Sequence, residues 1–136
     1  WSLPPHPTGV RVVLHYGPAE RGEPVPGEGR VVDTASGVNY VDTDTRRGLY
    51  PLALPSGLGS EAAGVVEAAG PDVDYLKPGD RVAYCVGPQG AYSQQRVMPA
   101  DRLVKLPDGI DDSIPAAAML KGLPVQYLFR PTFMLQ

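Results

Sequence analysis

A polar cluster that carries several aromatic rings is the part of this sequence best suited to chemistry. Its members are Asn39, Tyr40, Asp42, Thr43 and Tyr50, with Glu61 further along the chain. Amides, hydroxyls and carboxylates of this kind can orient a bound ligand or move a proton. The same residue types also fit a solvated loop whose Tyr rings pack against the body of the protein. The residues alone leave both interpretations open.

A glycine-rich segment beside this cluster matches the dinucleotide fingerprint G-x-G-x-x-[G/A]. The match is Gly57-Leu58-Gly59-Ser60-Glu61-Ala62. A true fingerprint follows a strand and opens a helix, so that the pyrophosphate meets the N–H groups of the helix. Here Pro51 and Pro55 precede the match, and a strand-like run follows it. We therefore reject the fingerprint and expect no Rossmann domain in this chain.

Metal and nucleophile sites also lack the residues they need. Zinc takes three or four Cys, His or carboxylate ligands, and the chain offers Cys85, His6 and His15. Cys85 lies in an alternating apolar run, which favours a small buried hydrophobe over a reactive thiol. Neither histidine stands in a recognisable Ser-His-Asp setting. We predict no metal site.

Composition excludes several classes of protein. The net charge is −3 with only 12 Lys and Arg, so no basic face for a nucleic acid is expected. No apolar run approaches the roughly 18 residues of a membrane span. With one Cys, no internal disulfide forms, and we expect a cytoplasmic setting. Residues 1–30 hold six Pro and five Gly, that is 11 of 30, a composition that predicts a flexible arm.

The remainder reads as short strands separated by tight turns, with helix only at the end. The expected strands are residues 10–16, 30–33, 62–69, 81–86, 90–97 and 103–106. Residues 39–50 show no clear period and are expected to be irregular. Asp111-Asp112-Ser113 before Pro115 predicts a helix start, Lys121-Gly122 a stop, and residues 123–129 a second short helix. The fold class is thus mainly β, a small, partly open barrel with short C-terminal helices.

Several segments, in the same order, resemble the quinone oxidoreductases of the medium-chain dehydrogenase/reductase superfamily. They are Gly37-Val38-Asn39-Tyr40-Val41-Asp42-Thr43, Gly48-Leu49-Tyr50-Pro51, Leu54 to Val66, Lys77-Pro78-Gly79-Asp80-Arg81-Val82-Ala83-Tyr84, Gly90-Ala91-Tyr92-Ser93, Pro99-Ala100-Asp101, Leu106 to Ile110, Met119-Leu120-Lys121-Gly122-Leu123 and Gln126-Tyr127-Leu128. The resemblance covers about 95 residues and implies a GroES-like β-barrel that forms one wall of an active-site cleft. Zinc-dependent relatives carry Cys at the position of Asn39 and His at that of Ser60, so the resemblance is to the zinc-free (zeta-crystallin-like) branch.

What the resemblance implies is hydride transfer from NADPH to a quinone or another conjugated carbonyl. Asn39 and Tyr50 are then the residues expected at the reacting groups. Asn39, Tyr40, Val41, Asp42 and Thr43 are expected to face the nicotinamide end of the cofactor, and Tyr127 to contact it from the inter-domain side. The resemblance is also compatible with a homodimer of the full-length relatives. The chain departs from the family's pattern at Asp44, Arg47 and Pro124.

We expect residues 31–136 to form the GroES-like substrate-side domain, truncated before the nucleotide-binding domain, with residues 1–30 as a poorly matching arm. Such a chain is incomplete as a catalyst, so its own enzymatic activity is uncertain. One alternative is a non-catalytic GroES-like module with only a binding or assembly role. Another is the enoyl reductase part of a larger synthase, which shares the same zinc-free barrel.

Overall fold

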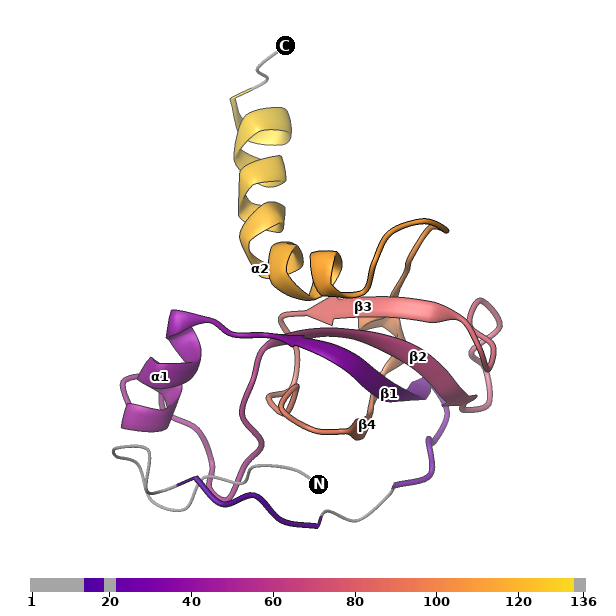
Figure 1. The fold of residues 1–136 in the computed structure, drawn as a ribbon, viewed down its shortest axis with the longest axis horizontal. Helices are drawn as coiled ribbons and strands as arrows, with labels where there is room; N and C mark the ends of the chain where they lie inside the picture. Colours follow the sequence, from indigo (N-terminus) through magenta and orange to yellow (C-terminus); the bar gives the residue numbers. More distant parts are fainter. Residues whose placement is uncertain (1–13, 19–21, 134–136) are drawn as a thin grey trace.

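The structure is a computed structural model that describes residues 14–18 and 22–133. The elements, in chain order, are β1 (Glu28–Gly37), α1 (Tyr40–Arg47), β2 (Glu61–Ala69), β3 (Arg81–Cys85), β4 (Gln95–Pro99), the 3₁₀ turn η2 (Ala100–Arg102), β5 (Val104–Lys105), α2 (Ser113–Tyr127) and the π-helical turn η3 (Leu128–Thr132). Figure 1 shows α2 rising from a curved sheet, with α1 at one end of that sheet. Among the described residues, no helix has the length and apolar content needed to cross a membrane.

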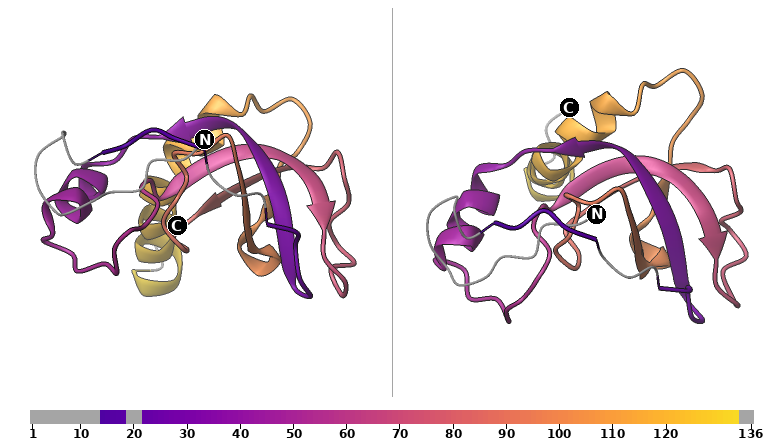
Figure 2. Two further views of the ribbon diagram at one scale, coloured as in Figure 1. Left: turned by 90° about the horizontal axis from the view of Figure 1, so that it is seen from below. Right: turned by 60° about the horizontal axis from the view of Figure 1, so that its bottom comes forward.

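The sheet has five antiparallel strands in the order β4-β1-β2-β3-β5. The two long strands, β1 and β2, arch together over the molecule (Figure 2). Their register shifts between Arg30 and Val31 and again between Asp33 and Ala35, and such bulges bend a strand. At Gly64 a Cβ atom would lie 2.1 Å from the carbonyl oxygen of Val32, so only glycine permits this close crossing. The open, mainly β barrel expected from the sequence is confirmed.

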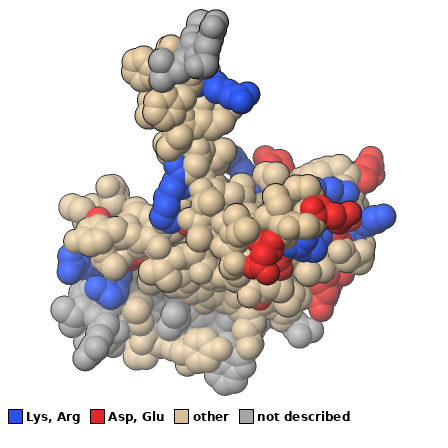
Figure 3. Space-filling model, turned by 45° about the horizontal axis from the view of Figure 1, so that its top comes forward, with Lys and Arg blue, Asp and Glu red and all other residues tan. Residues whose placement is uncertain are grey.

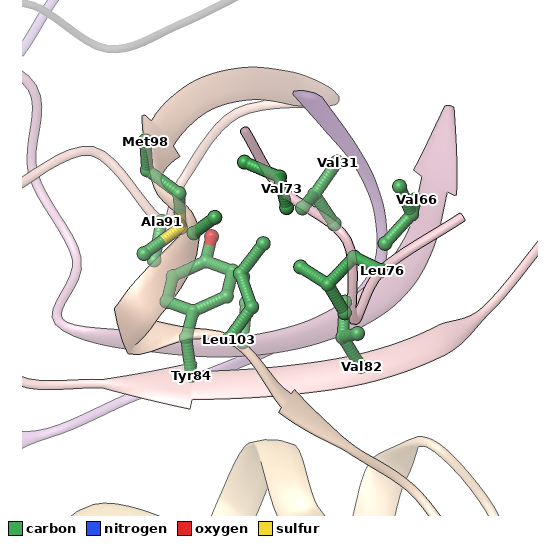
Figure 4. Close-up of a cluster of buried hydrophobic side chains, with 11 residues drawn as sticks. Val31, Val66, Val73, Leu76, Val82, Tyr84, Ala91, Met98 and Leu103 are labelled. Carbon is green, nitrogen blue, oxygen red and sulfur yellow. The ribbon is translucent and has the colours of Figure 1, made fainter. Parts of the chain in front are cut away.

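Side chains alternate between the two faces of the sheet and build two separate cores. The larger core fills the concave face and contains Val31, Ala62, Val66, Val73, Leu76, Val82, Tyr84, Ala91, Met98, Ala100 and Leu103 (Figure 4). The smaller core lies under α2 and contains Ala63, Ala83 and Ala116. Neighbouring residues such as Ala62 and Ala63 therefore face opposite cores, as the period of two in a strand requires. Alanines on the second face let α2 approach the sheet closely.

Three of the expected elements differ from the observed ones. Residues 40–47 form α1 although their sequence has no apolar stripe. Residues 90–94 do not join a strand, because the N–H groups of Gly90 and Ala91 donate to the carbonyl of Gly59 and that of Tyr92 donates to Leu58. The helix expected to stop at Lys121-Gly122 continues through both residues to Tyr127.

The other expected strands lie where they were predicted, with shifted ends. Residues 30–33 belong to the longer β1 and residues 62–69 to β2. Of the expected residues 81–86, residues 81–85 form β3, and of residues 103–106, only residues 104 and 105 form β5. Of the expected strand at residues 10–16, residues 10–13 lie outside the described part. Of the arm expected over residues 1–30, residues 1–13 and 19–21 also lie outside the described part, and β1 begins at Glu28.

Candidate functional site

Asn39 lies at the start of α1, where its side chain is held from two sides. Its Nδ2 donates to Oε1 of Glu61 at 2.8 Å, and its Oδ1 accepts from Nζ of Lys121 at 2.7 Å. Because an ammonium group can only donate, these two contacts fix which end of the amide is which. The residue is 8% exposed. Among the described residues, its second amide proton has no acceptor.

Glu61, the first residue of β2, connects three elements around this amide. It is fully buried and accepts from Nζ of Lys121 at 3.1 Å and from the backbone N–H of Leu120 at 2.7 Å, besides Asn39. A buried carboxylate needs such partners, since an unpaired charge in the interior is costly. Gly37 leaves the necessary room, because a Cβ atom there would lie 2.5 Å from Cγ of Glu61. The strand β2 and the helices α1 and α2 thus meet at one carboxylate.

Asp42, one turn into α1, anchors the other side of the site. Its Oδ2 accepts from the backbone N–H of Asn39 at 2.9 Å and from the hydroxyl of Tyr92 at 2.6 Å, and its Oδ1 accepts from the hydroxyl of Ser60 at 2.8 Å. Burial raises the pKa of Tyr92, and the hydrogen bond to Asp42 raises it further. Tyr92 is therefore a neutral donor at physiological pH.

A small pocket of ≈ 170 Å³ opens beside these residues. It is lined by Leu14, Val38, Asn39, Asp42, Thr43, Arg46, Leu58 and Tyr92. The four lining residues from the start of α1 onward have the spacing i, i+3, i+4 and i+7, which places them on one helix face. A second pocket, of ≈ 280 Å³, shares Tyr92 and is otherwise lined by Tyr16, Ser36, Ser93 and Gln94.

The structure brings only part of the predicted site together. Asn39, Asp42 and Thr43 share the pocket, whereas the side chains of Tyr40 and Tyr50 are 74% and 54% exposed and line neither pocket. Val41 is half-buried on α1, where its carbonyl accepts from Thr45. Tyr127 is the last residue of α2, which projects away from the sheet (Figure 1), and it is 62% exposed.

Three residues whose side chains hydrogen-bond to Asn39, Glu61 or Asp42 were not predicted from the sequence, and neither was Arg46 in the pocket wall. Tyr92 was assigned to a strand, Lys121 to a helix stop and Ser60 only to the position of a zinc ligand. Lys121 could have been identified because it lies in the segment Met119 to Leu123, which resembles the quinone oxidoreductases. No such signal pairs Tyr92 with Asp42, because 50 residues separate them in the sequence.

The described residues contain no group of three or more His, Cys, Asp or Glu side chains that could hold a metal ion. Cys85, at the end of β3, is 8% exposed. Burial raises the pKa of its thiol, and the charge of Glu61 raises it further. Such a thiol is a poor nucleophile.

Comparison with known proteins gives close matches. The sequence profile of the alcohol dehydrogenase GroES-like domain matches residues 25–108. A quinone oxidoreductase of Pseudomonas aeruginosa is 55% identical over 125 residues, which are 91% of this chain and 38% of that protein. The crystal structure of Escherichia coli quinone oxidoreductase complexed with NADPH superposes with a TM-score of 0.92 and 42% identity over 96% of this chain and 40% of that one.

A quinone oxidoreductase structure from Pseudomonas syringae superposes with a TM-score of 0.91 and 49% identity, over 96% of this chain and 41% of that one. The chain therefore spans about 40% of the length of these relatives. The resemblance to quinone oxidoreductases that the sequence segments indicated is confirmed. NADPH is the cofactor in the two solved relatives whose structures contain it.

Proposed function

Because the chain belongs to the alcohol dehydrogenase GroES-like domain family, we propose that it supplies one wall of an NADPH-dependent oxidoreductase site whose acceptor is a quinone or another conjugated carbonyl compound. The observation that carries the proposal is the amide of Asn39, which Glu61 and Lys121 hold in one orientation beside a pocket. An orienting group fixed in this way lowers the entropy cost of bringing two reactants together.

The residues present fit the nicotinamide half of the cofactor. When bound, NADPH supplies the hydride. The free amide proton of Asn39 can donate to a carboxamide oxygen, and Tyr40, Val41, Asp42 and Thr43 place the first turn of α1 beside it. We assign Tyr50 to the acceptor and Tyr127 to the inter-domain side of the cofactor. Within residues 14–18 and 22–133, no glycine-rich turn leads into a helix that could bind the phosphates, so we assign to these residues the orientation of the cofactor and not the binding of its phosphates.

We extend the proposal to zinc independence and to a cytoplasmic setting. Asn39 and Ser60 stand where zinc-dependent relatives carry Cys and His, and both side chains are engaged in hydrogen bonds within the protein. The buried free thiol of Cys85 suits a reducing compartment. A homodimer is also part of the proposal.

The test is a chimera that joins this chain to the part of the Pseudomonas aeruginosa quinone oxidoreductase that it does not span. We expect quinone-dependent NADPH oxidation by the chimera and none by the chain alone. Asn39→Ala is expected to lower kcat/KM on the order of 10²-fold, because misplacing a reactant costs about that much. Tyr50→Phe should lower it less, and Arg102→Gln, a change at an exposed residue of η2, should leave it unchanged.

Two outcomes would contradict the proposal. One is a folded chimera that binds NADPH but does not oxidise it with any quinone, which would favour the alternative of a non-catalytic GroES-like module. The other is an Asn39→Ala chimera with unchanged activity, which would remove the residue on which the proposal rests.

A further inference from the structure

Arg46 is a cation in the wall of the Asn39 pocket, and no carboxylate of the described residues forms an ion pair with it. It lies on the same face of α1 as Asn39 and Asp42, and it lines the pocket with them. Its Nε is buried and makes no hydrogen bond. Within residues 14–18 and 22–133, its guanidinium forms no ion pair either. The pocket wall therefore carries a positive charge that no described carboxylate pairs with, and such a position favours a ligand that brings a negatively charged acceptor.

The acidic residue in the same pocket does not take this role. Asp42 lies four residues before Arg46 on the helix, a spacing that often gives an ion pair. Its carboxylate instead accepts from the hydroxyls of Ser60 and Tyr92 and from the backbone N–H of Asn39. With these three hydrogen bonds, the carboxylate of Asp42 is held toward the sheet side of the site and forms no ion pair with Arg46.

The remaining lining indicates what kind of molecule fits. Leu14, Val38 and Leu58 make an apolar wall, and Asn39 and Thr43 add polar groups. The volume of ≈ 170 Å³ is below the roughly 300–1,000 Å³ of pockets that take drug-sized ligands. A short apolar chain that ends in an acceptor group matches both the size and the lining. A guanidinium recognises a carboxylate with two parallel hydrogen bonds and opposite charge, so a carboxylate is the acceptor group that it binds best.

We propose that this pocket binds a small conjugated acid through its carboxylate, with Arg46 as the specificity-determining residue. The inference rests on the proposed function and narrows its acceptor from conjugated carbonyl compounds in general to those that carry an acid group. Arg46 holds the carboxylate, and the carbon chain extends along Val38 and Leu58 toward the amide of Asn39.

The test is to titrate the chain, in the absence of NADPH, with crotonate and separately with crotonamide. Crotonamide is the uncharged amide of nearly equal size. Amide signals followed by two-dimensional NMR should shift for Asn39, Thr43 and Arg46 with crotonate. We expect crotonamide to bind about tenfold more weakly, because it offers the guanidinium one neutral acceptor oxygen in place of the two charged oxygens of a carboxylate. Arg46→Gln should remove this preference. Arg47→Gln, the same change at the neighbouring exposed arginine that does not line the pocket, should leave it intact.

Equal binding of crotonate and crotonamide, or a preference for crotonate that survives Arg46→Gln, would overturn the inference. The comparison of the two ligands on the unaltered chain needs no variant, so it decides the matter even where Arg46→Gln does not fold. The titration contains neither NADPH nor a quinone. A chimera that reduces quinones while crotonate fails to bind therefore contradicts only this inference, whereas selective crotonate binding with an inactive chimera contradicts only the proposed function.

Discussion

Asp33 is a charged residue of β1 whose side chain points into the larger core. Its Oδ2 accepts from the hydroxyl of Tyr84 at 2.9 Å, and its Oδ1 is buried without a hydrogen bond. Burial raises the pKa of Asp33 from 3.8 to about 7, although the hydrogen bond from Tyr84 and the charge of Arg96 lower it. The guanidinium of Arg96 lies over the ring of Tyr84, 5.3 Å from its centroid. The loss of contact with water therefore raises the pKa of Asp33 by more than Tyr84 and Arg96 lower it.

This raised pKa predicts how stability changes with pH. The folded protein holds the proton of Asp33 up to about pH 7, while the unfolded chain releases it near 3.8. The stabilising contribution is therefore complete below pH 3.8 and is lost as the pH rises through about 7. At about 1.36 kcal/mol per unit of pKa, the loss is as much as about 4 kcal/mol.

We expect Asp33→Asn to remove this loss. The variant should be more stable than the unaltered chain at pH 8, and the two should converge near pH 4, when the free energy of unfolding is measured with urea. Asp74→Asn, at an exposed residue, is the matched control and should leave the pH dependence unchanged. The same pH dependence in Asp33→Asn as in the unaltered chain would show that Asp33 is not the group responsible.

At the scale of elements, α1 is a helix that the spacing of apolar residues does not predict. Its eight residues include no regular apolar stripe, and the helix is instead defined by its two ends. The carboxylate of Asp42 accepts from the backbone N–H of Asn39, and Gly48 ends the helix with φ 86°, a left-handed conformation that favours glycine. Both ends could have been found from the spacing of Asn39, Asp42 and Gly48, because these are ordinary capping residues.

The strands were easier to predict than the contacts between them. Alternation and turn residues gave the strands at residues 62–69 and 81–86 because these properties are local. The contact of Asp42 with Tyr92, and that of Glu61 with Lys121, join residues about 50 and 60 positions apart. Local patterns carry no information on such pairs, so the sequence could name the segment from Asn39 to Thr43 and Glu61 as candidates but not the residues that they contact.

The course of α2 through Gly122 can be tested by substitution. In a helix interior, Gly is about 0.8–1.0 kcal/mol less favourable than Ala. A Cβ atom at Gly122 would meet nothing within 4 Å. We therefore expect Gly122→Ala to stabilise the protein by up to about 1 kcal/mol in urea unfolding.

Gly79→Ala is the matched control for this substitution. A Cβ atom there would also meet nothing within 4 Å, but Gly79 has φ +92°, so alanine should destabilise the protein. A helix that ended at Lys121-Gly122, as expected from the sequence, would place Gly122 in the left-handed conformation. Loss of stability in Gly122→Ala would therefore support that earlier expectation and contradict the continuous helix.

At the scale of the whole molecule, the projecting end of α2 is the largest departure from an ordinary protein surface. Together with η3 and the residue that follows it, this end carries six large apolar side chains that are 44–65% exposed: Leu123, Val125, Tyr127, Leu128, Phe129 and Phe133. Figure 3 shows this helix as a column with few charged atoms, and between Ser113 and Phe133 the sequence has only Lys121 and Arg130 as charged residues. A helix that is apolar on all sides is normally buried.

We expect this surface to make the chain associate as its concentration rises. Burying one Val side chain contributes about 1.5–3 kcal/mol, so a charge in its place should weaken association at least about tenfold. Val125→Glu should therefore bring the mass measured by sedimentation equilibrium closer to the 14.5 kDa of one chain. Val104→Glu is the matched control, because Val104 on β5 and Val125 on α2 are both 52% exposed. Since Val104 lies off the helix, its substitution should leave association unchanged. A mass of 14.5 kDa at every concentration, or an equal effect of both substitutions, would show that α2 does not drive association.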